Sequence, residues 1–344
     1  SDINGLSDAV SNSYQNVALG TNSGTSFLTG SPSSNRAEYN TFVGYNSGTN
    51  LTTGESNVAV GAYALNTATA ADWNVGIGVN SLLSVTTGDH NIGIGYQTAR
   101  TITTGIKNLA LGNSSLYSNT TGSYNISLGD NAGYHITTGP ENTIIGFEAG
   151  QNLTTGTENT SLGYQSGNRY GTAGSYNVSI GSLAMGTAAN SSTSNSGNTA
   201  VGYKALYVID GGATNTALGN QVLVKLTTGD YNAGVGGSAL SALTTGIRNT
   251  GVGFLAGYTT TTGDNNASIG AYTNDGTGII FTRAQNQFTF TVDVTGMGLT
   301  EGVFISATAT NSNGSTSEFS NITKVLLNCG TAILNPHVRS YRSR

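Results

Sequence analysis

The stretch "NTIIGFEAGQNLTTGTE", residues 142–158, is followed at once by "NTSLGYQSG", residues 159–167. Both begin with an asparagine that is followed, three and four residues later, by an aliphatic residue and a glycine. The same phrase opens at fifteen asparagines: Asn16, Asn40, Asn57, Asn74, Asn91, Asn108, Asn125, Asn142, Asn159, Asn177, Asn198, Asn215, Asn232, Asn249 and Asn266. Most steps between them are 17 residues, and the exceptions are 24, 18 and 21. A fixed period of this kind identifies a repeat architecture.

The 17-residue period predicts one coil of a parallel β-solenoid. Helical repeats need about 33 residues or more, whereas 17 residues suit two strands of about 4 to 6 residues and two turns. The alternation of aliphatic and small residues after each asparagine is typical of a strand. Glycine at the end of the phrase and in the closing "TTG" supplies turn conformations. We therefore expect an all-β fold, a parallel β-solenoid (β-roll) of about fifteen coils and about 70 Å in length.

The repeated asparagine predicts a ladder inside the stack, because its amide can hydrogen-bond to the coils above and below. The most regular part of the repeat assigns this role to seven residues: Asn57, Asn74, Asn91, Asn108, Asn125, Asn142 and Asn159. Small residues and larger aliphatics point to opposite sides of the strand, so one of these faces lies outside the coil. An aliphatic stripe repeated fifteen times would exceed the few hundred Å² that a monomer usually exposes. We therefore expect the rod to associate with copies of itself.

The repeat divides the chain into four segments. Residues 1–15 form a lead-in, residues 16–274 the solenoid, residues 275–330 a small antiparallel β unit, and residues 331–344 a tail. Alternating stretches such as "QFTFTVDVT" and "GVFISATATN" predict the strands of the third segment. This segment is either a cap on the solenoid end or a short module similar to the closing strands of an immunoglobulin-like domain.

The composition narrows the function. Only 8% of the residues are charged, against about 25% in ordinary soluble domains. The net charge is −5, and the absence of a sizeable basic patch argues against nucleic-acid binding. Without an apolar run long enough to span a bilayer, we expect no membrane insertion. The start at Ser1 suggests a processed chain or a fragment, and the single cysteine, Cys329, excludes an internal disulfide framework.

The phrases "NVALG", "NVAVG", "NISLG", "NTAVG" and "NASIG" resemble the head repeat of YadA-like trimeric autotransporter adhesins. The repetitive shafts of tail-fibre proteins are similar as well, and the likeness covers about Asn16 to Gly270. The resemblance implies a left-handed parallel β-roll that trimerises along its axis and presents an adhesive surface. The period is a departure from the family, because the adhesin heads favour shorter coils.

An aromatic column is the best candidate for ligand binding. The residue before the anchor asparagine is aromatic in six coils: Tyr39, Trp73, His90, Tyr124, Tyr176 and Tyr231. Flat rings with a polar edge can stack on sugar faces, and we name Tyr39, Trp73, Tyr124, Tyr176 and Tyr231 as candidate ligand-binding residues. The other interpretation is that these rings shield the coil edge or fill the junction between subunits.

The sequence offers little that could carry catalysis. His90 and His135 lie 45 residues apart in different turns, and the sequence contains no recognisable catalytic or metal motif. Glu55, Asp72 and Asp89 share one place in successive coils, as do Asp230 and Asp264 later. Stacked carboxylates could bind Ca²⁺ or serve a glycosidase, but solvated turn residues are the favoured interpretation. We therefore expect no enzyme, no cofactor and no metal.

The paired threonines of "TTG" raise a different possibility, because regular threonine arrays on flat solenoids bind ice. Thr154 and Thr155 are adjacent, so we expect them to point to opposite sides, with a single threonine column facing out. The favoured function is a structural and adhesive fibre segment, extracellular, on a cell surface or part of a virion. Its expected partners are copies of itself in a homotrimer and a surface glycan or host receptor. The alternatives are an ice-binding solenoid and a polysaccharide-degrading tail spike.

Overall fold

The computed structural model describes residues 15–26, 37–168, 170–186 and 195–270 in full. Outside these ranges it describes the backbone of seven short strands. Most of the expected lead-in, most of the tail, Cys329 and His337 lie outside the described residues. No helix in the described part of the chain is both long and apolar enough to cross a bilayer.

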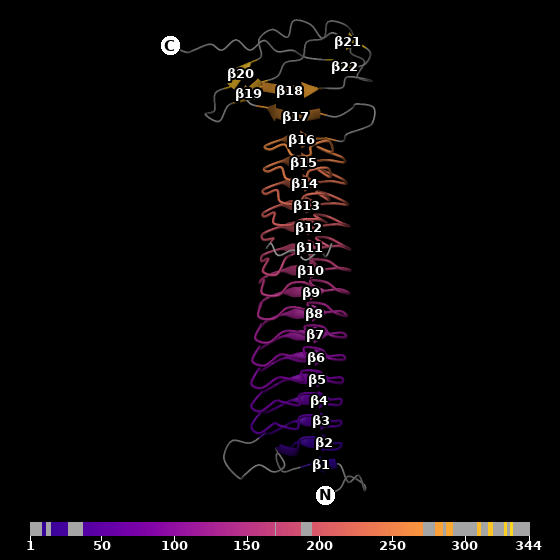
Figure 1. Cartoon of the computed structure of the whole chain (residues 1–344), viewed down its shortest axis with the longest axis vertical. Helices are drawn as coiled ribbons and strands as arrows, with labels where there is room; N and C mark the ends of the chain where they lie inside the picture. Colours follow the sequence, from indigo (N-terminus) through magenta and orange to yellow (C-terminus); the bar gives the residue numbers. More distant parts are fainter. Residues whose placement is uncertain are drawn as a thin grey trace, which may run out of the picture.

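The repeat region is a single stack of coils, each contributing one strand to a continuous parallel sheet (Figure 1). The fifteen strands are β2 (Val17–Leu19), β3 (Thr41–Val43), β4 (Val58–Val60), β5 (Val75–Ile77), β6 (Ile92–Ile94), β7 (Leu109–Leu111), β8 (Ile126–Leu128), β9 (Thr143–Ile145), β10 (Thr160–Leu162), β11 (Val178–Ile180), β12 (Thr199–Val201), β13 (Thr216–Leu218), β14 (Ala233–Val235), β15 (Thr250–Val252) and β16 (Ala267–Ile269). Neighbouring strands pair in register, as in Val58 with Val75 and Val75 with Ile92. The expected β-solenoid with a 17-residue period is confirmed.

Each coil contains one strand of three residues, so the expectation of two longer strands per coil is wrong. After the strand, residues such as Asn80 and Leu82 have positive φ values of 58° and 50°, which interrupt an extended conformation. Hydrogen bonds between coils nevertheless continue: the Asn80 N–H donates to the Ala62 carbonyl at 2.9 Å and the Leu82 N–H to the Thr98 carbonyl at 3.0 Å. The turns are therefore stacked as regularly as the strands.

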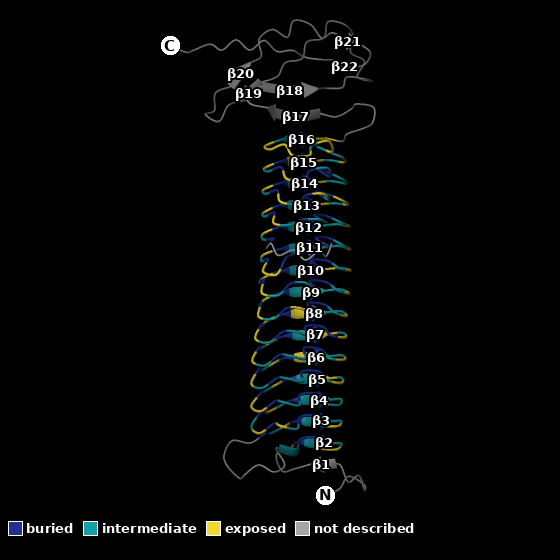
Figure 2. Cartoon of the chain, viewed as in Figure 1, coloured by how far each residue is buried: buried dark blue, intermediate teal, exposed yellow. Residues whose placement is uncertain are grey.

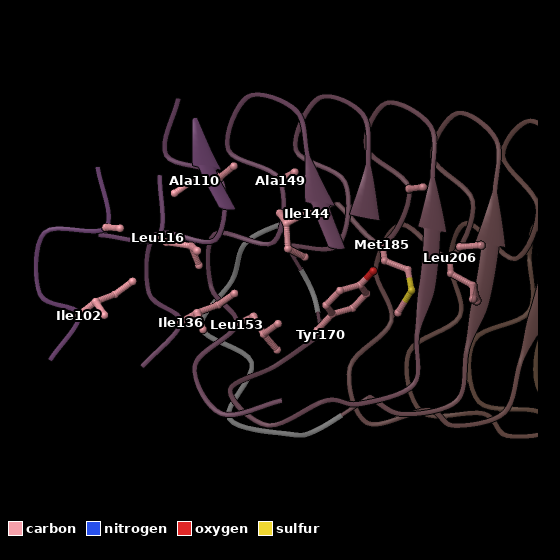
Figure 3. Packing of buried hydrophobic residues seen from close by; sticks show 14 of the residues in the cluster. Ile102, Ala110, Leu116, Ile136, Ile144, Ala149, Leu153, Tyr170, Met185 and Leu206 are labelled. Carbon is pink, nitrogen blue, oxygen red and sulfur yellow. The ribbon is translucent and has the colours of Figure 1, made fainter. Parts of the chain in front are cut away.

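The core is thin and formed by inward-pointing columns. The middle residue of each strand is buried and is usually Ala, Gly or Ser, whereas the residues on either side of it are partly exposed (Figure 2). Larger side chains from the turns, among them Leu116, Ile136 and Leu153, fill the space opposite the strands (Figure 3). The middle of the strand can be large only where the turn is small: Phe42 lies against Gly48 and Ile144 against Gly150.

The anchor asparagines form a continuous buried ladder. The Asn108 Nδ2 donates to Asn91 Oδ1 at 3.0 Å and to the Gly122 carbonyl at 2.9 Å. The Asn108 Oδ1 accepts hydrogen bonds from the backbone N–H and the Nδ2 of Asn125, at 3.0 and 3.1 Å. The seven asparagines of the regular stretch have buried side chains that take part in this ladder: Asn57, Asn74, Asn91, Asn108, Asn125, Asn142 and Asn159.

The two glycines of each coil serve different purposes. Gly129, which ends the strand phrase, has φ = +132°, and a Cβ there would lie 2.7 Å from the carbonyl carbon of Gly146. Gly122, in the closing "TTG", has no positive φ, so the expectation that it supplies a special turn conformation is wrong. A Cβ on Gly122 would instead lie 2.8 Å from the Gly139 carbonyl oxygen. The closing glycine therefore allows the coils to approach closely.

Tyr170 replaces the usual aliphatic residue in one coil and is fully buried. Its hydroxyl donates to the Thr160 carbonyl at 2.8 Å and accepts from the Ser161 hydroxyl at 2.9 Å. Burial raises the pKa of the Tyr170 phenol well above its ordinary value, an effect that the hydrogen bond with Ser161 only partly offsets. The neighbouring coils are the irregular ones, in which the asparagine steps are 18 and 21 residues.

Antiparallel strands pair with both ends of the parallel stack. β1 (Ala9–Ser11) pairs with β2, and β17 (Ile279–Ala284) pairs with β16. The other C-terminal strands also pair antiparallel: β17 with β18 (Gln287–Thr291), β19 (Thr308–Thr310) with β20 (Thr316–Glu318), and β21 (Leu327–Asn328) with β22 (Thr331–Ala332). Pairing of a terminal strand removes an open edge that would otherwise recruit other chains. It therefore favours a capping role for the strands next to the solenoid.

Candidate binding surface

The outward side of the parallel sheet is a regular apolar surface, which we call the strand face. It consists of the first and third side chains of strands β2–β16, which are mostly Val, Ile, Leu and Thr. The third residue is aliphatic in every strand, and Leu111 and Leu162 are 44% and 45% exposed. Because the strands pair in register, these side chains form straight columns with a spacing of about 4.8 Å. The aliphatic stripe expected from the sequence therefore faces outward.

The candidate ligand-binding rings lie at one margin of this face, two residues before a strand. We call Tyr39, Trp73, Tyr124, Tyr176 and Tyr231 the leading rings. All five have positive φ, between 54° and 61°, and are exposed between 48% and 61%. The coil conformation thus directs these side chains outward.

The leading rings do not form a continuous aromatic plate. They precede β3, β5, β8, β11 and β14, so two or three coils separate each ring from the next. Trp73 instead lies against His90, with 4.7 Å between ring centroids, and the Lys107 ammonium lies 5.3 Å from the centroid of the Tyr124 ring. The structure therefore offers separate single-ring contacts, and their role in ligand binding stays a prediction.

The opposite margin carries a second set of rings, two residues after a strand. We call Tyr45, Tyr96, Phe147, Tyr203 and Phe254 the trailing rings; they are exposed between 43% and 58%. One further ring at this margin, Tyr164, stacks on Phe147 with 5.7 Å between centroids. Each of these residues directly follows the glycine that ends the strand phrase, but the sequence analysis did not single them out as a site. The signal that could have done so is their spacing along the stack.

The acidic column is explained by hydrogen bonds within the chain. Asp72 Oδ1 accepts from the Glu55 backbone N–H at 2.7 Å, and Asp89 Oδ1 accepts from the Asp72 N–H at 2.8 Å. Asp230 and Asp264 make the same contact with the preceding coil. Within the described ranges, no three His, Cys, Asp or Glu side chains lie close enough to hold a metal ion. We therefore assign a structural role in the turn to this column.

The closing threonines lie at the surface: Thr154 is half-buried and Thr155 is exposed. Both hydroxyls donate to the same acceptor, the Thr172 carbonyl, so the expectation that Thr154 and Thr155 point to opposite sides of the coil is wrong. The first threonine of each pair donates to the next coil, as in Thr103 to the Thr120 carbonyl at 3.1 Å. The Thr154 hydroxyl donates in the same way to the Thr172 carbonyl at 2.6 Å. The hydroxyl protons of the first threonines are thus engaged within the chain, whereas second threonines such as Thr104, Thr121 and Thr138 are exposed.

We compared the chain with known protein families, with characterised proteins and with solved structures, and none of them matches it. A functional conclusion therefore depends on the strand face, its two ring-bearing margins and the chemistry of the surrounding surface.

Proposed function

We propose that this chain is a structural and adhesive segment of an extracellular fibre, on a cell surface or in a virion. Copies of the chain associate along the strand face, as a homotrimer, and the assembled rod binds a surface glycan or receptor. The observation that carries this proposal is the aliphatic strand face, which extends over all fifteen coils. The number of three copies comes from the resemblance of the repeat to the heads of trimeric adhesins.

The size of the strand face supports self-association. Fifteen strands at about 4.8 Å give a length of about 70 Å, and two outward columns give a width of about 10 Å. The product, about 700 Å², exceeds the 300–600 Å² or so of the largest patch on a typical monomer. It approaches the roughly 800 Å² that each partner contributes to a standard interface. A second copy is the simplest partner of matching length and regularity.

The remaining surface supports adhesion to a neutral ligand. Only 8% of the residues are charged, so long-range attraction to a charged polymer is weak. Half-exposed tyrosine and tryptophan rings offer apolar area with a polar edge, which suits the faces of sugars. Repetition along a rod also allows many weak contacts to act together. The leading rings are therefore the candidate receptor contacts.

Two measurements on the whole chain test this proposal. Light scattering should give the mass of a trimer, and the double change Leu111→Lys with Leu162→Lys should reduce it to that of a monomer. The matched control, Thr104→Lys with Thr155→Lys, places the same charges on the closing turn and should leave the trimer intact. A wild-type chain that stays monomeric at micromolar concentration contradicts the association.

Adhesion is tested separately on an array of cell-surface glycans. Trp73→Ala with Tyr124→Ala should reduce binding at least tenfold, whereas Thr121→Ala with Thr138→Ala should not. Binding that is unchanged in the first variant would remove the leading rings from the proposal. An assay of thermal hysteresis separates the ice-binding alternative, in which the exposed second threonines of the closing turns would form the ice-binding column. Because the acidic column has a structural explanation, we assign it no catalytic role.

A further inference from the structure

The rings at the two margins of the strand face recur with the same spacing. The trailing rings follow β3, β6, β9, β12 and β15, which is every third strand, and Tyr164 after β10 is one addition at the same margin. The leading rings precede β5, β8, β11 and β14, again every third strand, and Tyr39 before β3 is the one addition. Three coils correspond to about 14 Å along the rod. The chain thus has a second, longer repeat that is confined to its outward side chains.

From β5 to β15, a Phe, Tyr or Trp ring at one margin is accompanied at the other margin by a smaller side chain or by His, Glu or Arg, whereas β3 has Tyr39 and Tyr45 at its two margins. Where the leading residue is a ring, at β5, β8, β11 and β14, the trailing residues are Val79, Asp130, Ser182 and Gly237. Where the trailing residue is a ring, at β6, β9, β12 and β15, the leading residues are His90, Glu141, Gly197 and Arg248. From β5 to β15, no strand has an aromatic carbocycle of Phe, Tyr or Trp at both margins.

The fold of the single chain does not require this pattern. All coils share the same buried ladder and the same parallel register, whichever residue stands at the margins. The rings are about half exposed, so they contribute little to the core. A three-coil pattern in such side chains is therefore best explained by a contact outside the chain.

We propose that the two margins interlock between parallel copies of this chain and fix their axial register. The trailing margin of one copy lies against the leading margin of the next, with both copies at the same height. Tyr96, Phe147, Tyr203 and Phe254 then meet His90, Glu141, Gly197 and Arg248 of the neighbour, whereas Tyr45 meets Tyr39. The rings after β6, β9 and β12 each enter the space between two leading rings. A contact between two different margins generates a closed ring of copies when their heights agree. This inference rests on the self-association proposed above, and it assigns the leading rings to the contact between copies, where it replaces their proposed role as receptor contacts.

The strand face alone cannot set this register. Its aliphatic columns repeat every coil, so a shift of about 4.8 Å replaces each contact with an equivalent one. A one-coil shift in one direction, however, places trailing rings opposite leading rings in four pairs: Tyr96 with Trp73, Phe147 with Tyr124, Tyr203 with Tyr176, and Phe254 with Tyr231. The opposite shift places one such pair together, Tyr164 with Tyr176. The first shift thus requires two rings to fit at four places where the level register has one ring beside a different side chain. Any shift would also turn a closed ring into an open helical filament.

A linear polymer with a repeat of about 14 Å would be another way to match the spacing. Such a ligand would need rings at one margin only. It would not account for small residues at the opposite margin of the same level, which a neighbouring copy does. We therefore favour a second copy of the chain as the occupant.

Disulfide trapping tests the register in the whole chain with Cys329→Ser. Lys107→Cys with Asn113→Cys places thiols at the two margins of the same strand, β7. Lys107→Cys with Asp130→Cys places the thiols one coil apart, so that they meet only in the shifted register in which trailing rings face leading rings. All three side chains are exposed. Under mild oxidation we expect the Lys107→Cys, Asn113→Cys chain to give at least tenfold more disulfide-linked chains than the Lys107→Cys, Asp130→Cys chain.

Removal of the rings should abolish this preference. With Tyr96, Phe147, Tyr203 and Phe254 all changed to Ser, the two cysteine pairs should cross-link within about twofold of each other. Tyr164→Ser is the control, because Tyr164 lies outside the three-strand series, and it should leave the preference unchanged.

Light scattering on the same samples separates the possible failures. Copies that associate but cross-link equally in both pairs overturn the register while leaving the proposed self-association in place. A monomeric chain overturns both proposals. A monomeric chain that is retained by an immobilised polysaccharide only when its rings are present would identify the rings as a ligand site instead.

Discussion

The asparagine ladder makes a strong prediction about stability at Asn108. In Asn108→Ala, Asn91 Oδ1 and the Gly122 carbonyl each lose a donor. The Oδ1 of Asn108 also disappears as the acceptor for the backbone N–H and the Nδ2 of Asn125. The Nδ2 keeps its bond to the Gly139 carbonyl at 2.9 Å. The buried N–H of Asn125 and the Gly122 carbonyl are thus the two groups left without a partner.

These losses give the expected magnitude. Each of the two orphaned buried groups costs about 1–3 kcal/mol, and each of the two other hydrogen bonds contributes a net of about 0.5–1.5 kcal/mol. The total is about 3–9 kcal/mol, which is large for a single substitution. In a solenoid, neighbouring coils supply most of the stability of each coil, so the loss should concentrate near β7 and β8.

Asn266 provides the matched control at the end of the stack. Its side chain makes one ladder bond, from Nδ2 to Asn249 Oδ1 at 2.8 Å, so Asn266→Ala should cost only about 0.5–1.5 kcal/mol. Hydrogen exchange measured by mass spectrometry gives the free energy of local opening coil by coil. If Asn108→Ala destabilises its own coil no more than Asn266→Ala does, the ladder is not a principal source of stability.

Three other substitutions follow from the packing of the core. Gly48→Ala should destabilise the fold by about 2–4 kcal/mol in denaturant titrations, because a Cβ would collide with the Phe42 ring and the φ of Gly48 is +56°. In a chain that also carries Phe42→Ala, the steric part of this cost should disappear. Asn119→Leu should stabilise the fold by about 1–3 kcal/mol, because the buried Oδ1 and Nδ2 of Asn119 have no hydrogen-bond partner within the described residues, and a fall in stability would reveal a missing partner. Burial raises the pKa of Tyr170 in the folded state. Above about pH 10 the unfolded chain therefore releases this proton while the folded chain keeps it, so the free energy of unfolding should fall as the pH rises. Tyr170→Phe should flatten this alkaline slope in unfolding titrations at pH 8 and pH 11.

The sequence predicts the architecture because the repeat is dictated by backbone stacking. A buried amide at every coil, such as Asn108, requires an equivalent group directly above and below it, so the 17-residue step translates directly into one coil. The conformation of the turns could not be predicted from the sequence. Leu82 adopts φ = +50° in a buried position, against the usual preference of a branched side chain. The turn that contains Leu82 is held by hydrogen bonds to both neighbouring coils, from Asn80 to Ala62 and from Leu82 to Thr98. The conformational preferences of single residues carry no information about these bonds.

The candidate surface was only partly predictable for a related reason. Trp73 and the other leading rings were identified because they share one place in the repeat. The three-coil spacing of the trailing rings is also visible in part from residue numbers: Tyr45 and Tyr96, Tyr96 and Phe147, and Tyr203 and Phe254 are each 51 residues apart. Only the step from Phe147 to Tyr203, which is 56 residues, interrupts it. The structure absorbs this insertion outside the paired strands, so strand number shows the regularity without interruption.

A β-solenoid of this kind separates what the fold requires from what its partners require. The inward positions tolerate few residue types: Asn in the ladder, glycine where coils touch, and side chains of matched volume in the core, such as Phe42 against Gly48. The margins of the strand face carry no such restriction, and they vary from Gly237 to Trp73. Regular variation at unrestricted positions cannot come from the requirements of folding. The alternation of large and small residues every third coil therefore points to contacts with another molecule, and the matching alternation at both margins points to a copy of the same chain.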